Sequence, residues 1–162
     1  MEFAEFYEAS WVPCLRAVVA SVGDRALAED LVAEAFARAW ASWRRVSRHA
    51  APRAWVVRTA LNEGVSRWRR RRFESLGATE EQRTLDAEDE ETLDTALLEA
   101  LRRLPVRQRE VIALRVFLDL DTEATARHLG IAPGTVTAHL SRAVTALRRE
   151  LAPTGTRRPD DE

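Results

Sequence analysis

The sequence predicts an all-α fold of two small helical domains joined by a flexible acidic linker. Apolar residues recur at intervals of three and four over most of the chain, and no segment of convincing length alternates in the manner of a strand. Residues 76–92 combine seven acidic residues with few apolar ones, which is typical of a segment that forms no packed core. We therefore divide the 162 residues into domains at 1–75 and 93–152, a linker at 76–92 and a disordered tail at 153–162.

Composition excludes several classes of protein. No apolar run approaches the roughly 18 residues of a membrane span, and the acidic N-terminus lacks the basic start of a secretory signal, so we expect a cytoplasmic protein. Cys14 is the only cysteine, which excludes an intramolecular disulfide and a multi-cysteine zinc site, and we expect it to pack between helices. The three histidines have no metal-ligand spacing and no phosphate-binding glycine loop is present, so we expect no metal, no cofactor and no enzyme.

The first domain is expected to be helical throughout, and its most regular helix follows Gly23-Asp24. Asp24 is the expected N-cap, since an aspartate before the first periodic residue accepts a backbone N–H. Two adjacent apolar rows give this helix a wide buried face: Leu27, Leu31, Ala35 and Ala39, and Val32, Phe36, Trp40 and Trp43. Acidic residues along its N-terminal half leave a polar face that is free to meet a partner.

A further helix is expected to begin near Pro52, because proline is favoured in a first helical turn. The segment from Arg44 to Arg72 contains ten arginines and one acid, Glu63, which is a local charge of +9. Tryptophans are interspersed among these arginines; we expect each of them to pack in the core, with stacking on unpaired bases as the alternative. Such a concentration of positive charge is typical of a nucleic-acid surface.

The second domain contains the spacing of a helix-turn-helix. Counted from Thr122, Ala126 is fifth, Gly130 ninth and Val136 fifteenth. These positions need a small residue between helices, a left-handed turn and an apolar residue under the second helix, respectively. Pro133 suits the start of that second helix, which would enter a major groove by its N-terminal residues. A plain helical hairpin is the structural alternative, and the spacing favours DNA binding.

A helix-turn-helix leaves the biological role open. The segment "LPVRQREVIALRVFLDLDTEATARHLGIAPGTVTAHLSRA" is compatible with a LuxR-like transcriptional regulator and with region 4 of a bacterial sigma factor. The first half contains an arginine- and tryptophan-rich helical domain in place of a receiver or sensor. With "GDRALAEDLVAEAFARAWASW" and "PRAWVVRTALNEGVSRWRRRR" in that half, the whole chain resembles an extracytoplasmic-function (ECF) sigma factor of the sigma-70 family, with regions 2 and 4 only. A stand-alone LuxR-like regulator remains the alternative.

The resemblance implies partners and site residues. RNA polymerase core would bind through its β′ coiled coil and β flap, promoter DNA would bind both domains, and an anti-sigma factor is a candidate partner. Core binding would involve Asp30, Leu31, Glu34 and Arg38, whereas Phe36 and Trp40 at neighbouring positions are expected in the interior. Recognition and melting of the −10 element would use Arg53, Arg58, Asn62, Arg67, Trp68 and Arg69. The −35 element would be contacted by Thr135, Thr137, Ala138, His139, Arg142, Arg115 and Arg127.

Overall fold

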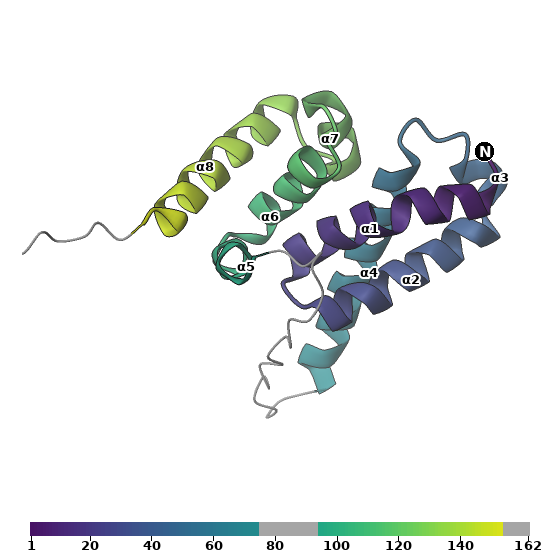
Figure 1. The fold of residues 1–162 in the computed structure, drawn as a ribbon, viewed down its shortest axis with the longest axis horizontal. Helices are drawn as coiled ribbons and strands as arrows, with labels where there is room; N and C mark the ends of the chain where they lie inside the picture. Colours follow the sequence, from purple (N-terminus) through teal and green to yellow (C-terminus); the bar gives the residue numbers. More distant parts are fainter. Residues whose placement is uncertain (75–93, 154–162) are drawn as a thin grey trace, which may run out of the picture.

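The protein, seen in a computed structural model, is described for residues 1–74 and 94–153, which form helices and no strand (Figure 1). This confirms the all-α prediction. The first module contains α1 (Phe3–Val22), α2 (Arg25–Ala41), α3 (Trp43–Val46) and α4 (Pro52–Glu74). The second contains α5 (Thr95–Arg102), α6 (Val106–Ile112), the π-helical turn η1 (Ala113–Phe117), α7 (Thr122–Leu129) and α8 (Pro133–Leu151). None of the described helices is long and apolar enough to cross a bilayer. The predicted linker and most of the predicted tail lie outside the described residues.

Capping residues set where several helices begin. Asp24 Oδ1 accepts the N–H of Leu27 at 3.0 Å, so the predicted N-cap of α2 is confirmed. Asp121 caps α7 in the same way, accepting the N–H of Ala124 at 2.7 Å. Proline is the first residue of both α4 and α8, where its missing N–H costs nothing. The chain is thereby divided into helices at the positions that the sequence indicates.

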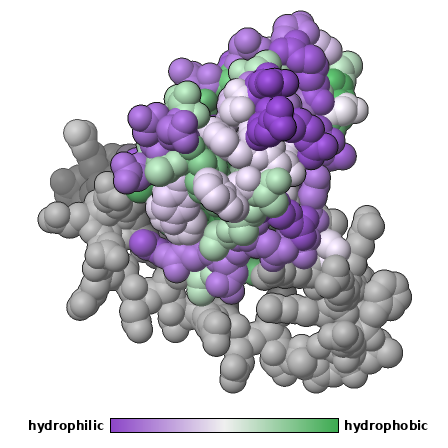
Figure 2. Space-filling view, turned by 90° about the vertical axis from the view of Figure 1, so that its right-hand side faces the viewer, coloured by the Kyte–Doolittle hydropathy of each residue, from purple (hydrophilic) through white to green (hydrophobic). Residues whose placement is uncertain are grey.

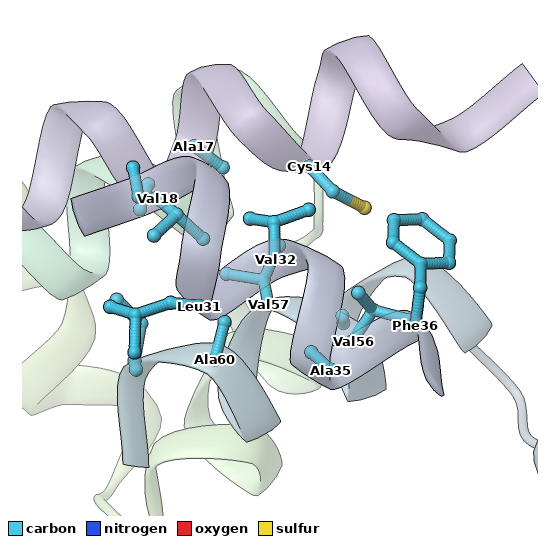
Figure 3. Packing of buried hydrophobic residues seen from close by; sticks show 14 of the residues in the cluster. Cys14, Ala17, Val18, Leu31, Val32, Ala35, Phe36, Val56, Val57 and Ala60 are labelled. Atoms are coloured by element: carbon cyan, nitrogen blue, oxygen red, sulfur yellow. The ribbon is translucent and has the colours of Figure 1, made fainter. Parts of the chain in front are cut away.

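The core of the first module lies between α1, α2 and α4. Cys14, Ala17 and Val18 of α1 point towards the apolar rows of α2 and α4 (Figure 3). Cys14 is fully buried, as predicted, and burial raises the pKa of its thiol to about 12. Three of the six buried residues of α2 are alanines, Ala28, Ala35 and Ala39, and these small side chains let the helices approach closely. At Gly64 the backbone of α4 is so near α2 that an added Cβ would lie 3.1 Å from Leu31 Cδ1.

The helix-turn-helix of the second module has the predicted contacts. Ala126 of α7 and Val136 of α8 form one buried cluster with Val111 of α6. Gly130 has φ +65°, the left-handed conformation that ends α7 and turns the chain into α8. Each of the three positions singled out by the spacing therefore has the conformation or burial that the motif requires.

The two modules pack directly against each other, which the sequence did not predict. α1 contacts α5, α6 and η1, and α4 contacts α7 (Figure 1). Leu98, Ala113 and Leu114 of the second module belong to the same buried cluster as the core of the first. Arg102 Nε donates to the carbonyl oxygen of Gly23 at 2.7 Å, across the boundary between modules. The described residues thus form a closed arrangement with a shared core.

Candidate nucleic-acid interface

The outer face of α2 carries the acidic residues predicted to bind core polymerase. Asp30 is exposed, and Glu34 accepts a hydrogen bond from Arg38 Nη2 at 2.7 Å one turn later. The same guanidinium contacts Glu63 of α4 at 3.1 Å. The hydrogen bond with Glu34 raises the pKa of Arg38, so that this side chain stays charged and ties α2 to α4. Asp30, Glu34 and Arg38 therefore share one polar surface, as expected from their spacing.

Two assignments on α2 need correction. Leu31 is 0% exposed and belongs to the bundle core, so it supports the fold and is no part of the exposed polar face. Phe36 is interior, as predicted, at 2% exposure, but Trp40 is 64% exposed. Trp40 lies at the last turn of α2, where its ring meets Phe3 edge-on at 4.9 Å between centroids. An i, i+4 row shows on which side of α2 a residue lies. It does not show how far the neighbouring helix α1 extends, and Trp40 lies where α1 no longer covers that side.

The end of the first module near Trp40 has a mixed surface. Met1, Tyr7 and Trp40 are large apolar side chains exposed there. Figure 2 looks onto the side of the molecule that carries the N-terminus and α3, and it shows paler and hydrophobic residues between hydrophilic ones. Apolar side chains gathered on a surface are typical of a protein-binding site.

Asn62 lines a pocket between α2, α3 and α4. The pocket has a volume of about 490 Å³, within the range of small-ligand sites. Trp55 supplies an aromatic wall, and Arg38 and Arg45 supply positive charge. Thr59 Oγ1 donates to the Trp55 carbonyl oxygen at 2.8 Å, so its own lone pairs remain available as acceptors. Among the remaining lining residues are Ala41, Ser42 and Glu63. An amide, a ring face and guanidinium groups thus surround one hollow.

The predicted −10 residues do not all share this surface. Arg53 lies in the first turn of α4, where Nη2 donates to the Ala9 carbonyl oxygen at 2.8 Å and Nε to Ser10 Oγ at 3.1 Å. Arg53 thereby holds α4 against α1. Asn62 lies nine residues further along the chain, so the two side chains lie on roughly opposite sides of α4. Arg58 is exposed beside α7 of the second module. Arg67, Trp68 and Arg69 belong to the backbone of α4, and their side chains lie outside the described residues.

The N-terminal half of α8 presents the predicted −35 residues. Thr135, Thr137 and Arg142 are exposed, whereas Ala138 and His139 are half-buried. Thr137 Oγ1 donates to the Pro133 carbonyl oxygen at 3.2 Å, which leaves the hydroxyl oxygen as an acceptor. His139 Nδ1 is buried without a hydrogen-bond partner, so only Nε2 is available to a ligand. The exposed surface of the N-terminal half of α8 thus offers mainly hydroxyl groups, one imidazole nitrogen and the guanidinium of Arg142.

The two predicted phosphate contacts near α7 differ. Arg127 is exposed on α7. Arg115 is half-buried in η1, where Nη1 donates to the Leu120 carbonyl oxygen and Nε has no partner. Its guanidinium therefore stabilises the turn between η1 and α7, a turn in which Asp119 takes φ 53°. Such a local role leaves less of Arg115 available to DNA than the sequence suggested.

Sequence reasoning missed a contact between modules. The rings of His49, in the loop before α4, and His128, in α7, have centroids 5.3 Å apart. Their separate positions in the sequence give no signal of this, because it depends on how the modules dock. In residues 1–74 and 94–153, no group of three or more His, Cys, Asp or Glu side chains could hold a metal ion.

Known proteins match both modules in this order. Residues 11–74 match the family model described as Sigma-70 region 2, and residues 94–147 match Sigma-70, region 4. Both matching models are those of sigma factors, and they support the sigma-factor reading over the LuxR-like alternative.

Whole-chain relatives agree with the family models. The RNA polymerase sigma-E factor of Streptomyces coelicolor is 34% identical over 154 residues, covering 93% of this chain and 86% of the relative. The ECF RNA polymerase sigma factor SigL of Mycobacterium tuberculosis is 35% identical over 143 residues, or 84% and 81% of the two chains. The sigma factor RpoE from Bartonella quintana, solved in complex with the anti-sigma factor NepR, superposes with a TM-score of 0.80 at 28% identity and covers 94% of this chain and 98% of that one. The chain therefore belongs to the sigma-70 family and is an RNA polymerase sigma factor of the extracytoplasmic-function class, containing regions 2 and 4.

Proposed function

We propose that the first module, 1–75, binds core polymerase through α2 and opened −10 DNA through α4, and that the second, 93–152, reads the −35 duplex through α8. The observation that carries the proposal is the pocket at Asn62, where an amide, a tryptophan ring and cations meet. Melting a promoter requires a place for unstacked bases beside a cationic track, and stacking on an aromatic face stabilises each base by about 1–3 kcal/mol. The pocket offers each of these groups.

In this proposal Asn62 hydrogen-bonds the edge of an unpaired base. Its amide can donate and accept at once, which matches the paired donor and acceptor on a base edge. Trp55 offers a ring face at the pocket wall, and Arg45 supports the adjoining phosphate. Arg58, exposed one turn before Asn62, extends the track. Arg67, Trp68 and Arg69 remain proposed contacts further along α4.

We propose that the second module binds the −35 duplex weakly and that its main effect is to set the register of the protein along the DNA. Thr135, Thr137, Ala138, His139 and Arg142 would face base edges, with Arg127 on a phosphate. Thr137 would accept from an amino group, because its hydrogen is bonded within the helix. Only Arg142 can form the bidentate contact with guanine that dominates specific recognition. Polymerase and the first module would therefore supply most of the affinity.

Core polymerase is proposed to dock on the polar face formed by Asp30, Glu34 and Arg38, with Trp40 as an apolar neighbour. Trp40 fits the profile of an interface anchor, since tryptophans dominate binding energy at protein surfaces. We further propose a cytoplasmic protein without catalytic activity of its own that binds an anti-sigma factor, since the structural relative from Bartonella was solved in complex with one.

Asn62→Ala tests the proposal in the assembled holoenzyme. Loss of a base-edge contact should weaken promoter opening by about 1–3 kcal/mol, which is roughly 5- to 150-fold. Permanganate reactivity of unpaired thymines would report opening, and binding to core polymerase would be measured separately. Asp30→Ala should show the reverse pattern, with weaker core binding and normal opening at saturating polymerase. Equal loss of core binding in both variants would contradict the division of labour between α2 and α4.

Transcription from a randomised promoter library would give the preferred −10 and −35 sequences. In that library Thr137→Ala should relax the preference at one −35 position, whereas Thr145→Ala, exposed on the same helix two turns later, should leave it unchanged. A preference unchanged by Thr137→Ala would remove that residue from the proposed reading surface.

A further inference from the structure

The joint between the modules contains two histidines and two arginines. His128 lies in the last turn of α7 and is 9% exposed. Its ring lies against that of His49, with centroids 5.3 Å apart and planes at 46°. Arg58 of α4 and Arg127 of α7 are also close enough to act electrostatically on His128. Residues of both modules thus meet in one cationic cluster.

Among the described residues, no acid is one of the groups that act electrostatically on His128. His49, Arg58 and Arg127 are the charged groups that act on His128, and α8 and η1, which also pack against α7, add none. Neither arginine forms an ion pair within the described residues 1–74 and 94–153. A charge gained by His128 here would face other cations and little water.

Burial and the surrounding cations favour the neutral form of His128 in the closed arrangement. The N–H of Ala51 donates to His49 Nδ1 at 3.1 Å, so this nitrogen must be an unprotonated acceptor. Burial lowers the pKa of His128 from its usual 6.5, and His49, Arg58 and Arg127 lower it further. Protonating His128 would place a charge in a cationic and mostly buried site.

We propose that the His49–His128 contact is a proton-sensitive latch that holds the two modules together when neutral and releases α7 from the first module when protonated. The sign follows from linkage. The closed form binds the His128 proton more weakly than the open form, so closure is unaffected well above pH 6.5. As the pH falls through 6.5, His128 is protonated in the open form before it is protonated in the closed form. The ratio of closed to open chains therefore falls until the pH is below the pKa of His128 in the closed form. The total fall is tenfold for each unit by which the open-form pKa exceeds the closed-form pKa.

Release of α7 from the first module matters because the closed chain cannot reach the −10 and −35 elements at once. This consequence for promoter binding rests on the proposed function. The −10 and −35 elements are about 25 base pairs apart, or about 85 Å along the duplex. The two modules share a core in the closed arrangement. In addition, Arg58 and Arg127, proposed contacts of the two elements, face the same joint. Both arginines are already exposed in the closed arrangement, and opening would separate them.

The latch is tested on the full-length chain without DNA or polymerase, so that its failure is separate from failure of the proposed function. Dyes on Glu8→Cys and Thr145→Cys, exposed positions in different modules, would report separation by energy transfer. Cys14 stays unlabelled because it is buried and its thiol pKa is raised to about 12. Energy transfer should change between about pH 8 and pH 5.5, with a midpoint below 6.5.

Neutral substitutions identify the group responsible. His49→Gln and His128→Gln should each reduce the pH response, and the double variant should abolish it. His139→Gln, the third histidine, is the matched control and should retain the response. Proton NMR of the three imidazole C2–H signals gives a second measurement, in which His128 should titrate below 6.5 and shift upwards in His49→Gln. An unchanged response in the double variant, no response in the parent chain, or a His128 pKa at or above 6.5 would overturn the latch.

Discussion

Leu31 and Asp30 are adjacent on α2, and the structure assigns them opposite roles. Leu31 is fully buried and meets the close backbone of α4 at Gly64. Asp30 is exposed on the surface proposed to bind polymerase. We therefore predict that Leu31→Ala reduces the free energy of unfolding and that Asp30→Ala reduces polymerase affinity, each with little of the other effect.

The expected size follows from burial. Truncation of a fully buried leucine costs about 2–5 kcal/mol, through lost transfer energy and the cavity left behind. Its neighbours, Ala28 and Ala35, are small helical residues that cannot swing into the space, so we expect the upper half of that range. For a chain of this length the melting temperature should fall by roughly 7–20 °C. Asp30→Ala should change stability by less than about 0.5 kcal/mol, as exposed substitutions usually do.

Urea denaturation followed by circular dichroism would give both stabilities, and titration of labelled core polymerase both affinities. Affinity is compared at a temperature where more than nine-tenths of the Leu31→Ala chain is folded, so that unfolding does not imitate weak binding. The reasoning fails if Leu31→Ala costs less than about 1 kcal/mol or if the folded variant binds polymerase more weakly than Asp30→Ala.

Three further predictions concern other parts of the chain. Gly130→Ala should destabilise by about 1–2 kcal/mol through its left-handed φ alone, since an added Cβ meets nothing within 4 Å, and Gly134→Ala, equally open but without a positive φ, should cost nothing in the same urea experiment. Cys14 should stay unreactive towards a thiol reagent at pH 8, because burial raises its pKa to about 12; rapid modification of the folded chain would show that α1 is loosely held. Trp40→Ala should weaken polymerase binding by about 2 kcal/mol or more with a smaller loss of stability, and the opposite ratio would return Trp40 to a packing role.

The sequence predicted those features that depend on local pattern. Ala126, Gly130 and Val136 sit as the helix-turn-helix spacing requires, because tight packing of two consecutive helices leaves little choice of residue at these positions. Asp24 and Pro52 mark helix starts by the chemistry of unpaired N–H groups. Periodicity likewise placed Phe36 in the core, where three helices surround it.

The sequence did not indicate features that depend on neighbours distant in the chain. Periodicity shows which side of α2 is apolar, but not where α1 stops covering it, so Trp40 was wrongly expected inside. A count of arginines gives a charge and no partners. Arg53 and Arg115 turned out to bind carbonyl oxygens of their own chain, while Arg58 and Arg127 form no ion pair within the described residues. The docking of the modules has no local signature at all.

The shared core makes the two modules thermodynamically dependent. Leu98 and Leu114 are buried together with residues of α1, so unfolding either module would expose apolar surface on the other. The full chain should then melt in a single cooperative transition, with calorimetric and van't Hoff enthalpies that agree. A fragment that contains the first module alone would expose the apolar surface of α1 to water and tend to self-associate. Deletion studies that assign activities to separate halves would partly be measuring aggregation.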